Sequence, residues 1–248
     1  MKRFTIEQLD TIINRGLIVS CQPVVNGALD RTDAVVAMGL ACLAGGAKAL
    51  RIEGAGRVRQ VRESTAAPII GIVKRDLPDS EIRITPTPED IADLSRAGAD
   101  IIAFDATDRT RPYSREALVG AIVEHECYGM ADCSIIDDVE FSLGNGVEFI
   151  GTTLSGYTGG ITPEEPDYAF LSNAVRIAPR VIAEGRYNTI EHSREAIRLG
   201  AWGVTVGTAL TRLETMTGWF VEGLRDARTG DDRDAEFASG PARRMSGI

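Results

Sequence analysis

Residues 96–105 read RAGADIIAFD, and this stretch combines the signals that decide the fold. The Ala97-Gly98-Ala99 turn is typical of a helix end, where glycine adopts the left-handed conformation. The apolar run that follows is continuous rather than alternating, which favours a strand covered on both faces in a parallel sheet. The run then ends in a charged residue, Asp105. We interpret this stretch as one strand of a βα repeat.

The same pattern recurs along the chain and predicts eight strands, each followed by a stretch with helical periodicity. The predicted strands span residues 17–21, 47–52, 68–73, 99–105, 129–133, 147–152, 180–185 and 202–207. Small-residue turns containing glycine precede four of them, at residues 44–48, 96–100, 144–148 and 199–203. Helical stretches begin at small polar caps, which include Thr87, Ser114 and Asn188-Thr189.

Eight βα units without a break in composition favour a closed barrel. We therefore predict an α/β fold, a single-domain (β/α)8 barrel with a short N-terminal helix. The first strand ends in Cys21-Gln22-Pro23 and not in a Gly-rich dinucleotide turn, which disfavours an open doubly wound sheet. The predicted barrel domain covers residues 1–226. Residues 227–248 offer little to bury, so we expect a flexible C-terminal tail there.

Composition and charge limit the classes of partner. The 248 residues are 44% hydrophobic and 25% charged, the balance of an ordinary globular protein. The 27 Lys and Arg against 36 Asp and Glu give a formal charge of −9. We therefore expect no nucleic acid and no membrane surface as a partner, because both require a basic face. A small anionic ligand is still compatible with this charge, since it needs only a few local donors.

Cysteine spacing and the N-terminal residues indicate the compartment. The four cysteines match neither a paired zinc motif nor a dense disulfide framework, so we expect reduced thiols. The first 16 residues lack the apolar stretch of a secretory signal. No segment reaches the roughly 18 apolar residues of a membrane span. These patterns predict a cytoplasmic protein.

In a barrel of this kind the chemistry lies where the strands end, so polar residues there form the candidate site. The strand ends deliver Gln22, Arg51, Glu53, Lys74, Arg75, Asp76, Asp105, Asp132, Thr152, Thr153, Glu184, Arg186, Gly207 and Thr208. Charged residues directly after buried strands are costly unless they are paired. A salt bridge at the barrel rim would explain any one of them. The combination of Lys74, Glu184, Arg51 and Asp132 favours a catalytic site.

The last two strands carry a predicted phosphate site. They end in Gly185 and Gly207, and the loops after these strands commonly bind phosphate through exposed backbone N–H groups. Arg186 and Arg212 would add bidentate donors. Tight turns alone would also explain the two glycines.

The loop at residues 151–160 is long and rich in hydroxyl groups. Its Thr152 and Tyr157 are candidates for contact with substrate, either in a lid or in a sugar-binding loop. A simple exposed connection has a similar composition, so both interpretations stay open.

The histidines do not support a metal site. His125 and His192 fall on predicted helices, away from the strand ends, which disfavours a histidine triad or a His-ligated metal. Asp105, Asp132 and Glu184 alone could bind a divalent cation. We expect no metal and no cofactor.

Eight stretches in chain order resemble one known family. They are LIVSCQP at 17–23, LRIEG at 50–54, IIGIVKRDLPDS at 69–80, ADIIAFDATDRTRP at 99–112, MADCS at 130–134, IGTTLSGYT at 150–158, VIAEGRYNT at 181–189 and GAWGVTVGTALTRLE at 200–214. On these motifs the sequence resembles the N-acetylmannosamine-6-phosphate 2-epimerases. The resemblance implies a TIM barrel isomerase of sialic acid and amino-sugar breakdown. Such an enzyme interconverts N-acetylmannosamine 6-phosphate and N-acetylglucosamine 6-phosphate without a redox cofactor.

The resemblance also implies roles for individual residues. Lys74 matches the catalytic acid/base, and Glu184 matches its partner. The matching substrate-contacting positions are Gln22, Arg51 and Asp132, and the matching phosphate positions are Gly185, Gly207 and Arg212. The predicted ligand is a small phosphorylated amino sugar. Because the outer helices of a barrel often bury an apolar face against a second copy, we also expect a homodimer or other homo-oligomer.

Two other functions stay open from the residues alone. Lys74 could form a Schiff base in an aldolase or lyase, since that chemistry also favours a lysine with a lowered pKa. A barrel that binds a sugar phosphate without turnover is the other alternative. The presence of both Lys74 and Glu184 disfavours it, because binding alone needs no acid/base pair.

Overall fold

The computed structural model describes the backbone of residues 2–159 and 161–238. Within these ranges it describes the side chains as far as residue 225. Eight parallel strands close into a barrel in chain order, with β8 paired to β1. The strands are β1 (Gly16–Cys21), β2 (Ala49–Glu53), β3 (Ile69–Ile72), β4 (Ile101–Asp105), β5 (Tyr128–Asp132), β6 (Phe149–Gly151), β7 (Val181–Ala183) and β8 (Gly203–Val206). The predicted (β/α)8 barrel and its eight strands are confirmed.

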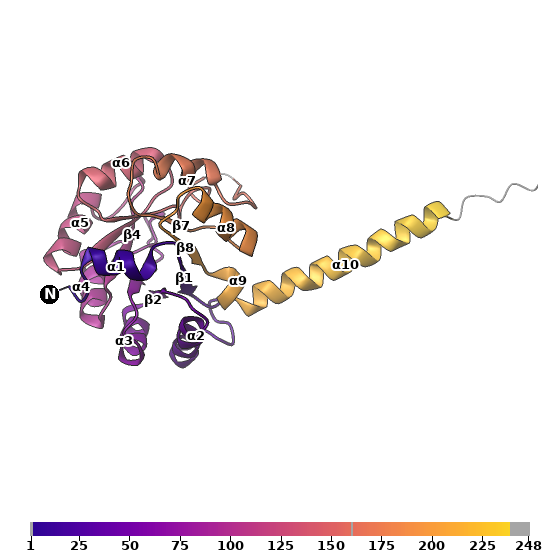
Figure 1. Ribbon diagram of the computed structural model, residues 1–248, viewed down its shortest axis with the longest axis horizontal. Coiled ribbons are helices and arrows are strands. Elements are labelled where there is room, and N and C mark those ends of the chain that lie inside the picture. The colour runs from indigo at the N-terminus through magenta and orange to yellow at the C-terminus, as the bar shows by residue number, and fades with distance from the viewer. Residues whose placement is uncertain (1, 160, 239–248) are drawn as a thin grey trace, which may run out of the picture.

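Helices surround the barrel, and the N-terminal helix lies across one end of it (Figure 1). The helices are α1 (Ile6–Ile13), α2 (Thr32–Ala44), α3 (Ala55–Ser64), α4 (Pro88–Ala97), α5 (Arg115–Glu124), α6 (Ile136–Gly144), α7 (Tyr168–Ala174), α8 (Ile190–Arg198), α9 (Thr208–Thr211) and α10 (Leu213–Ala238). None of the helices within the described ranges is long and apolar enough to cross a membrane.

Local signals in the sequence set these boundaries. The side chains of Thr87, Ser114 and Thr189 each cap the helix that follows by accepting a backbone N–H. The four predicted glycine turns contain left-handed glycines, such as Gly98 with φ of 95°. Only glycine adopts this conformation without a steric penalty, so the turn ends α4 and directs the chain into β4.

The end of the barrel beneath α1 is closed. Leu9 and Ile13 of α1 are fully buried against barrel residues that include Ile18 and Trp202. Asp10 holds this helix in place, since its carboxylate accepts a hydrogen bond from the Trp202 indole at 2.9 Å and a bidentate pair from Arg180. A site open to solvent is therefore restricted to the opposite end, where the strands finish.

The C-terminal part follows a different course from the other outer helices. Helix α10 begins at Leu213 and leads away from the barrel (Figure 1). The predicted boundary at residue 226 falls inside this helix. The division into a barrel domain and a flexible tail stays a prediction, and residues 239–248 lie outside the described part of the chain.

Candidate active site

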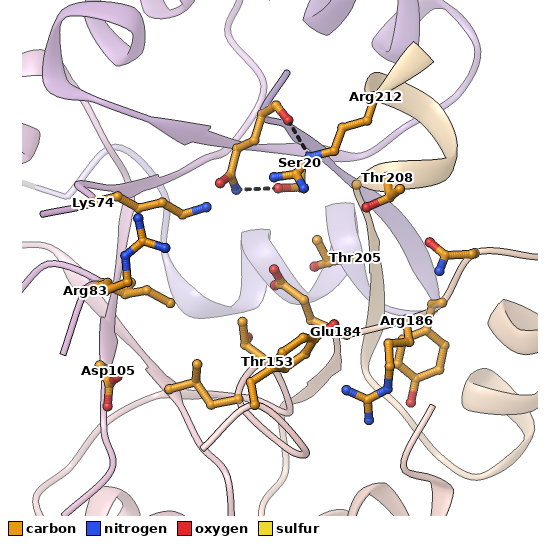
Figure 2. A pocket seen from close by; sticks show the side chains of 18 of the residues that line it. Ser20, Lys74, Arg83, Asp105, Thr153, Glu184, Arg186, Thr205, Thr208 and Arg212 are labelled. Atoms are coloured by element: carbon orange, nitrogen blue, oxygen red, sulfur yellow. Dashed lines mark hydrogen bonds between the residues drawn. The ribbon is translucent and has the colours of Figure 1, made fainter. Parts of the chain in front are cut away.

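A pocket of about 460 Å³ lies at the ends of the strands (Figure 2). Its lining includes most of the predicted site residues, namely Gln22, Lys74, Tyr157, Glu184, Gly185, Arg186, Gly207, Thr208 and Arg212. They come from widely separated parts of the sequence, and the parallel closed sheet brings them to one end of the barrel. The strand-end argument thus located the pocket.

Lys74 stands at one side of the pocket, at the base of an excursion that leaves the barrel after β3 and returns at Ile84. Its side chain is accessible to solvent through the open mouth, yet the pocket wall removes much of its hydration. This desolvation lowers the pKa of Lys74 to about 8, and the positive charges of Arg51 and Arg212 act in the same direction. Lys74 is therefore uncharged in a larger fraction of molecules near neutral pH than an ordinary lysine.

Glu184 is the residue that follows β7, and its side chain extends into the middle of the pocket (Figure 2). Thr152 fixes its backbone, because the threonine hydroxyl accepts the Glu184 N–H at 2.9 Å and donates to the Glu184 carbonyl at 2.8 Å. The carboxyl is only 13% exposed, and this burial raises its pKa to about 7. The neighbouring Asp132 charge adds to the rise, while Arg51 opposes it.

A buried network supports Glu184 from beneath. Arg51 is 1% exposed and contacts both Asp132, at 2.6 Å, and Glu184, at 2.9 Å. Asp132 is fully buried and also accepts a hydrogen bond from the Thr153 hydroxyl at 2.6 Å. Arg51, Asp132 and Thr152 therefore lie below the pocket surface, with contacts that reach Glu184. Their predicted contact with substrate stays a prediction.

The other end of the pocket carries the groups predicted to bind phosphate. Gly207 leads into α9, and a Cβ added to it would lie 3.3 Å from the Cβ of Ser20, which is a close approach. Arg212 follows α9, and its Nε donates to the Gln22 carbonyl at 3.1 Å. Figure 2 shows Arg212 and Thr208 on the same side of Glu184. An anionic group of a ligand would meet a cation, a hydroxyl and glycine backbone at this end.

Arg186 has a different set of contacts. Its guanidinium donates to the carbonyls of Ser155 and Glu165, at 2.7 Å each, and lies 5.0 Å from the ring centre of Tyr157. These contacts hold the loop after β6 against the pocket edge, with Tyr157 facing the pocket. The assignment of Arg186 to phosphate stays a prediction, whereas its role in holding this loop is visible in the structure.

Sequence reasoning missed several residues of the lining. They are Ser20, Glu81, Arg83, Ile84, Arg109, Leu154, Tyr187, Asn188 and Thr205. Ser20 and Thr205 carry a signal, because each is a polar residue inside an otherwise apolar strand, at an inward position. Arg83 and Arg109 come from long connections, where no periodicity indicates direction.

The acidic residues considered as cation ligands are paired with arginines. Asp105 contacts Arg109 at 2.7 Å, while Asp132 and Glu184 share Arg51. Within the described residues, no group of three His, Cys, Asp or Glu side chains gathers where it could hold a metal ion.

Comparisons with known proteins agree on one family. A family model described as "Putative N-acetylmannosamine-6-phosphate epimerase" matches residues 35–226. A protein of Pasteurella multocida named "Putative N-acetylmannosamine-6-phosphate 2-epimerase" is 50% identical over 228 residues, which cover 92% of this chain and 100% of that protein. A protein of the same name from Vibrio cholerae is 53% identical over 215 residues, or 87% and 90% of the two chains.

One solved structure supports the same family, and another shares the fold. The N-acetylmannosamine-6-phosphate 2-epimerase from Clostridium perfringens superposes with a TM-score of 0.85 at 34% identity, covering 90% of this chain and 99% of that one. The tryptophan synthase alpha-subunit of Pyrococcus furiosus reaches a TM-score of 0.60 at 17% identity, which is a likeness of fold alone.

Proposed function

Since the chain belongs to the N-acetylmannosamine-6-phosphate epimerase family, we propose that it interconverts N-acetylmannosamine 6-phosphate and N-acetylglucosamine 6-phosphate through proton transfers by Lys74 and Glu184. The reaction is an isomerisation in amino-sugar and sialic acid breakdown. One observation supports the two residues above all. Lys74, with a pKa lowered to about 8, and Glu184, with a pKa raised to about 7, line the same pocket. Shifts of this kind mark acid/base pairs.

Inversion at C2 requires removal of a proton next to the C1 carbonyl of the open-chain sugar. The neutral Lys74 amine takes this proton, and the C2–H electrons move into the C1–C2 bond while the C1 oxygen becomes an enolate. Protonated Glu184 donates to that oxygen and stabilises the developing charge. After the enol intermediate turns in the pocket, the Lys74 ammonium returns a proton to the opposite face of C2, while the C1 hydroxyl gives its proton back to Glu184 and the carbonyl re-forms. Both side chains regain their starting protonation states, so no net proton or electron is consumed.

Phosphate binding at the far end of the pocket orients the sugar for this step. Arg212, Thr208 and the backbone at Gly207 lie at that end. Binding energy gained there restricts the substrate, so that C2 lies beside Lys74 rather than moving freely in the open pocket.

Solvent deuterium tests the role of Lys74. In deuterated water, the wild type is expected to incorporate deuterium at C2 of N-acetylmannosamine 6-phosphate as product forms, which proton NMR follows directly. Lys74→Ala is expected to abolish both incorporation and turnover while phosphate-sugar binding persists. Retained exchange in this variant would remove Lys74 from the mechanism.

We also propose that the protein is a homodimer, supported by the exposed apolar face of α10. Trp219, Phe220 and Leu224 on this helix are exposed, Phe220 by 70%. In chain order α10 is the outer helix expected after β8, because α9 has only four residues, yet it leads away from the barrel (Figure 1). Exposure of large apolar side chains together indicates an interaction surface.

A second copy of the chain is the proposed occupant of this face, because α2 offers an apolar surface too. Its exposed positions include Ala37, Leu40, Ala41 and Ala44, which lie on one side of the helix. Light scattering on the purified protein is expected to give twice the 26.6 kDa chain mass. Phe220→Glu is expected to yield monomer, whereas the neighbouring Glu222→Gln keeps the dimer. A monomeric wild type would contradict the proposal.

We further propose a cytoplasmic location. The four cysteines are free, and three of them are buried, as expected of a protein from a reducing compartment.

A further inference from the structure

The excursion at residues 74–84 begins directly at Lys74, so the placement of this lysine depends on how the excursion is anchored. Lys74 and Ile84 form an antiparallel bridge at its base, and the Arg75 N–H donates to the Arg83 carbonyl at 3.0 Å. A lysine side chain is long and flexible, so its backbone fixes the region that the amine can reach rather than one position. What fixes the backbone on either side of Lys74 thus controls whether that region includes the substrate.

Thr85 anchors the residue before Lys74. Its N–H donates to the Val73 carbonyl at 2.7 Å, and its hydroxyl accepts the Val73 N–H at 3.3 Å. The same hydroxyl donates to the Ala103 carbonyl of β4 at 2.6 Å. Thr85 is fully buried, so these bonds are shielded from water. One side chain therefore ties the end of β3 to β4 immediately before the lysine.

The backbone of Thr85 supports a functional reading of these contacts. Its φ is 47°, in the left-handed region that a β-branched residue rarely adopts. Such conformations persist only where surrounding contacts impose them, and they concentrate at functional sites.

The residue after Lys74 is Arg75, and Asp90 anchors it. Its Nε donates to the Asp90 carboxylate at 2.8 Å and a terminal nitrogen donates at 2.6 Å. Asp90 is fully buried in the first turn of α4, where the Thr87 hydroxyl also binds it. This pair directs the Arg75 side chain away from the pocket, toward α4, and the neighbouring Lys74 side chain lines the pocket.

We propose that Thr85 and the Arg75–Asp90 ion pair are positioning groups that hold Lys74 in reach of the substrate. Neither Thr85 nor Arg75 lines the pocket, so both act through the backbone on either side of Lys74. The inference rests on the proposed role of Lys74. A displacement of about 1 Å in a reacting group is enough to lower a rate by roughly a hundredfold.

Thr85→Val tests this inference, because valine keeps the shape and removes the hydroxyl. Its kcat for C2 exchange is expected to fall by about 10- to 100-fold, with KM for the sugar phosphate within about twofold of wild type. Thr85→Ser retains the hydroxyl and is expected to stay within about threefold of wild type.

The pH profile gives a readout that a merely structural role would not move. Lys74 faces Arg51 and Glu53 from β2, Arg212 after α9 and Glu184 after β7. A lysine displaced toward solvent regains hydration, and its pKa rises from about 8. In the bell-shaped profile of this pair the falling, alkaline limb of kcat/KM follows the higher of the two pKa values, which is that of Lys74. This alkaline limb is therefore expected to move to higher pH in Thr85→Val and not in Thr85→Ser.

Ser142→Ala is the matched control, since Ser142 is also fully buried and donates to a main-chain carbonyl, that of Asp138, at 2.7 Å on α6. It is expected to keep the wild-type kcat and pH limb. If Thr85→Val does not fold by circular dichroism, Arg75→Gln replaces it, because Arg75 is half-exposed and Asp90 keeps its bond to Thr87.

The outcomes separate the two proposals. Wild-type kcat and pH limb in Thr85→Val, or in Arg75→Gln where it is used, would overturn the positioning inference while Lys74→Ala still abolishes exchange. Exchange retained in Lys74→Ala would instead overturn the proposed function itself, and the positioning inference with it.

Discussion

Replacing Arg51 with methionine tests the cost of the buried charges beneath the pocket. Arg51 is the cation between Asp132 and Glu184, and both Arg51 and Asp132 are essentially inaccessible to water. Removing one partner of a buried ion pair costs about 3–5 kcal/mol, because the remaining charge is left without compensation. In a domain of this size each kcal/mol lowers Tm by about 2–4 °C, so the expected loss is roughly 6–20 °C.

Differential scanning calorimetry of Arg51→Met beside Arg57→Met measures this cost against a matched control. Arg57 also contacts two carboxylates, Asp30 at 2.6 Å and Glu53 at 3.5 Å, but it is 20% exposed. A partly exposed pair is worth about 0–1 kcal/mol, or less than about 4 °C. Equal Tm losses in the two variants would refute the argument that burial sets the cost of the unpaired charges.

The Tm of Arg51→Met is also expected to depend on pH differently from that of the wild type. In the folded protein the pKa of Glu184 is about 7, above its ordinary 4.5, so this group stabilises the fold fully below its unfolded pKa. That contribution is lost as pH rises through the folded value. Without Arg51 the pKa of Glu184 rises further, and ionisation in the folded state becomes costlier. Below about pH 7 both folded proteins keep Glu184 protonated, so the Tm gap to wild type is expected to widen as pH rises from about 7 to about 8 and beyond; a constant gap across this range would contradict the pairing.

Three further outcomes are expected. The kcat/KM profile is bell-shaped, with limbs near pH 7 and pH 8 that belong to the coupled Lys74 and Glu184 pair; a flat profile from pH 6 to 9 would count against it. Glu184→Gln lowers kcat by about 10²- to 10⁴-fold in the NMR assay, because the amide cannot exchange a proton, and near wild-type turnover would remove Glu184 as the acid. Arg212→Ala raises KM by about tenfold or more in steady-state assays, and an unchanged KM would contradict the phosphate assignment.

Features of the sequence that act over short distances predicted the fold. Apolar runs mark the strands, polar caps such as Thr87 mark where helices begin, and glycine turns such as Gly98 mark where they end. The parallel sheet then places the strand ends together. Depth within the barrel was not predicted. Arg51 is the third residue of β2, one layer below the rim, so it lies under Glu184 rather than in the open pocket.

Long-range contacts account for the other differences. Arg186 directly follows the predicted strand at residues 180–185, which made it a candidate for phosphate, but the carbonyls it meets belong to the loop after β6. The ion pair of Arg75 with Asp90 likewise joins residues 15 positions apart. No pattern within one segment indicates such pairs, because the partner of each arginine is decided by the packing of two segments.

Desolvation shifts the pKa values of both members of the proposed catalytic pair, the base Lys74 downward and the acid Glu184 upward. At pH 7.5, a lysine with pKa about 8 is neutral in about a quarter of molecules, and a carboxyl with pKa about 7 is protonated in about a quarter. Both conditions hold in roughly 6% of molecules. With the ordinary values of 10.5 and 4.5 they would hold in about one in a million. Burial thus raises the reactive population by several orders of magnitude, and Arg51 adjusts it from both sides, since its charge lowers the pKa of Lys74 and limits the rise at Glu184.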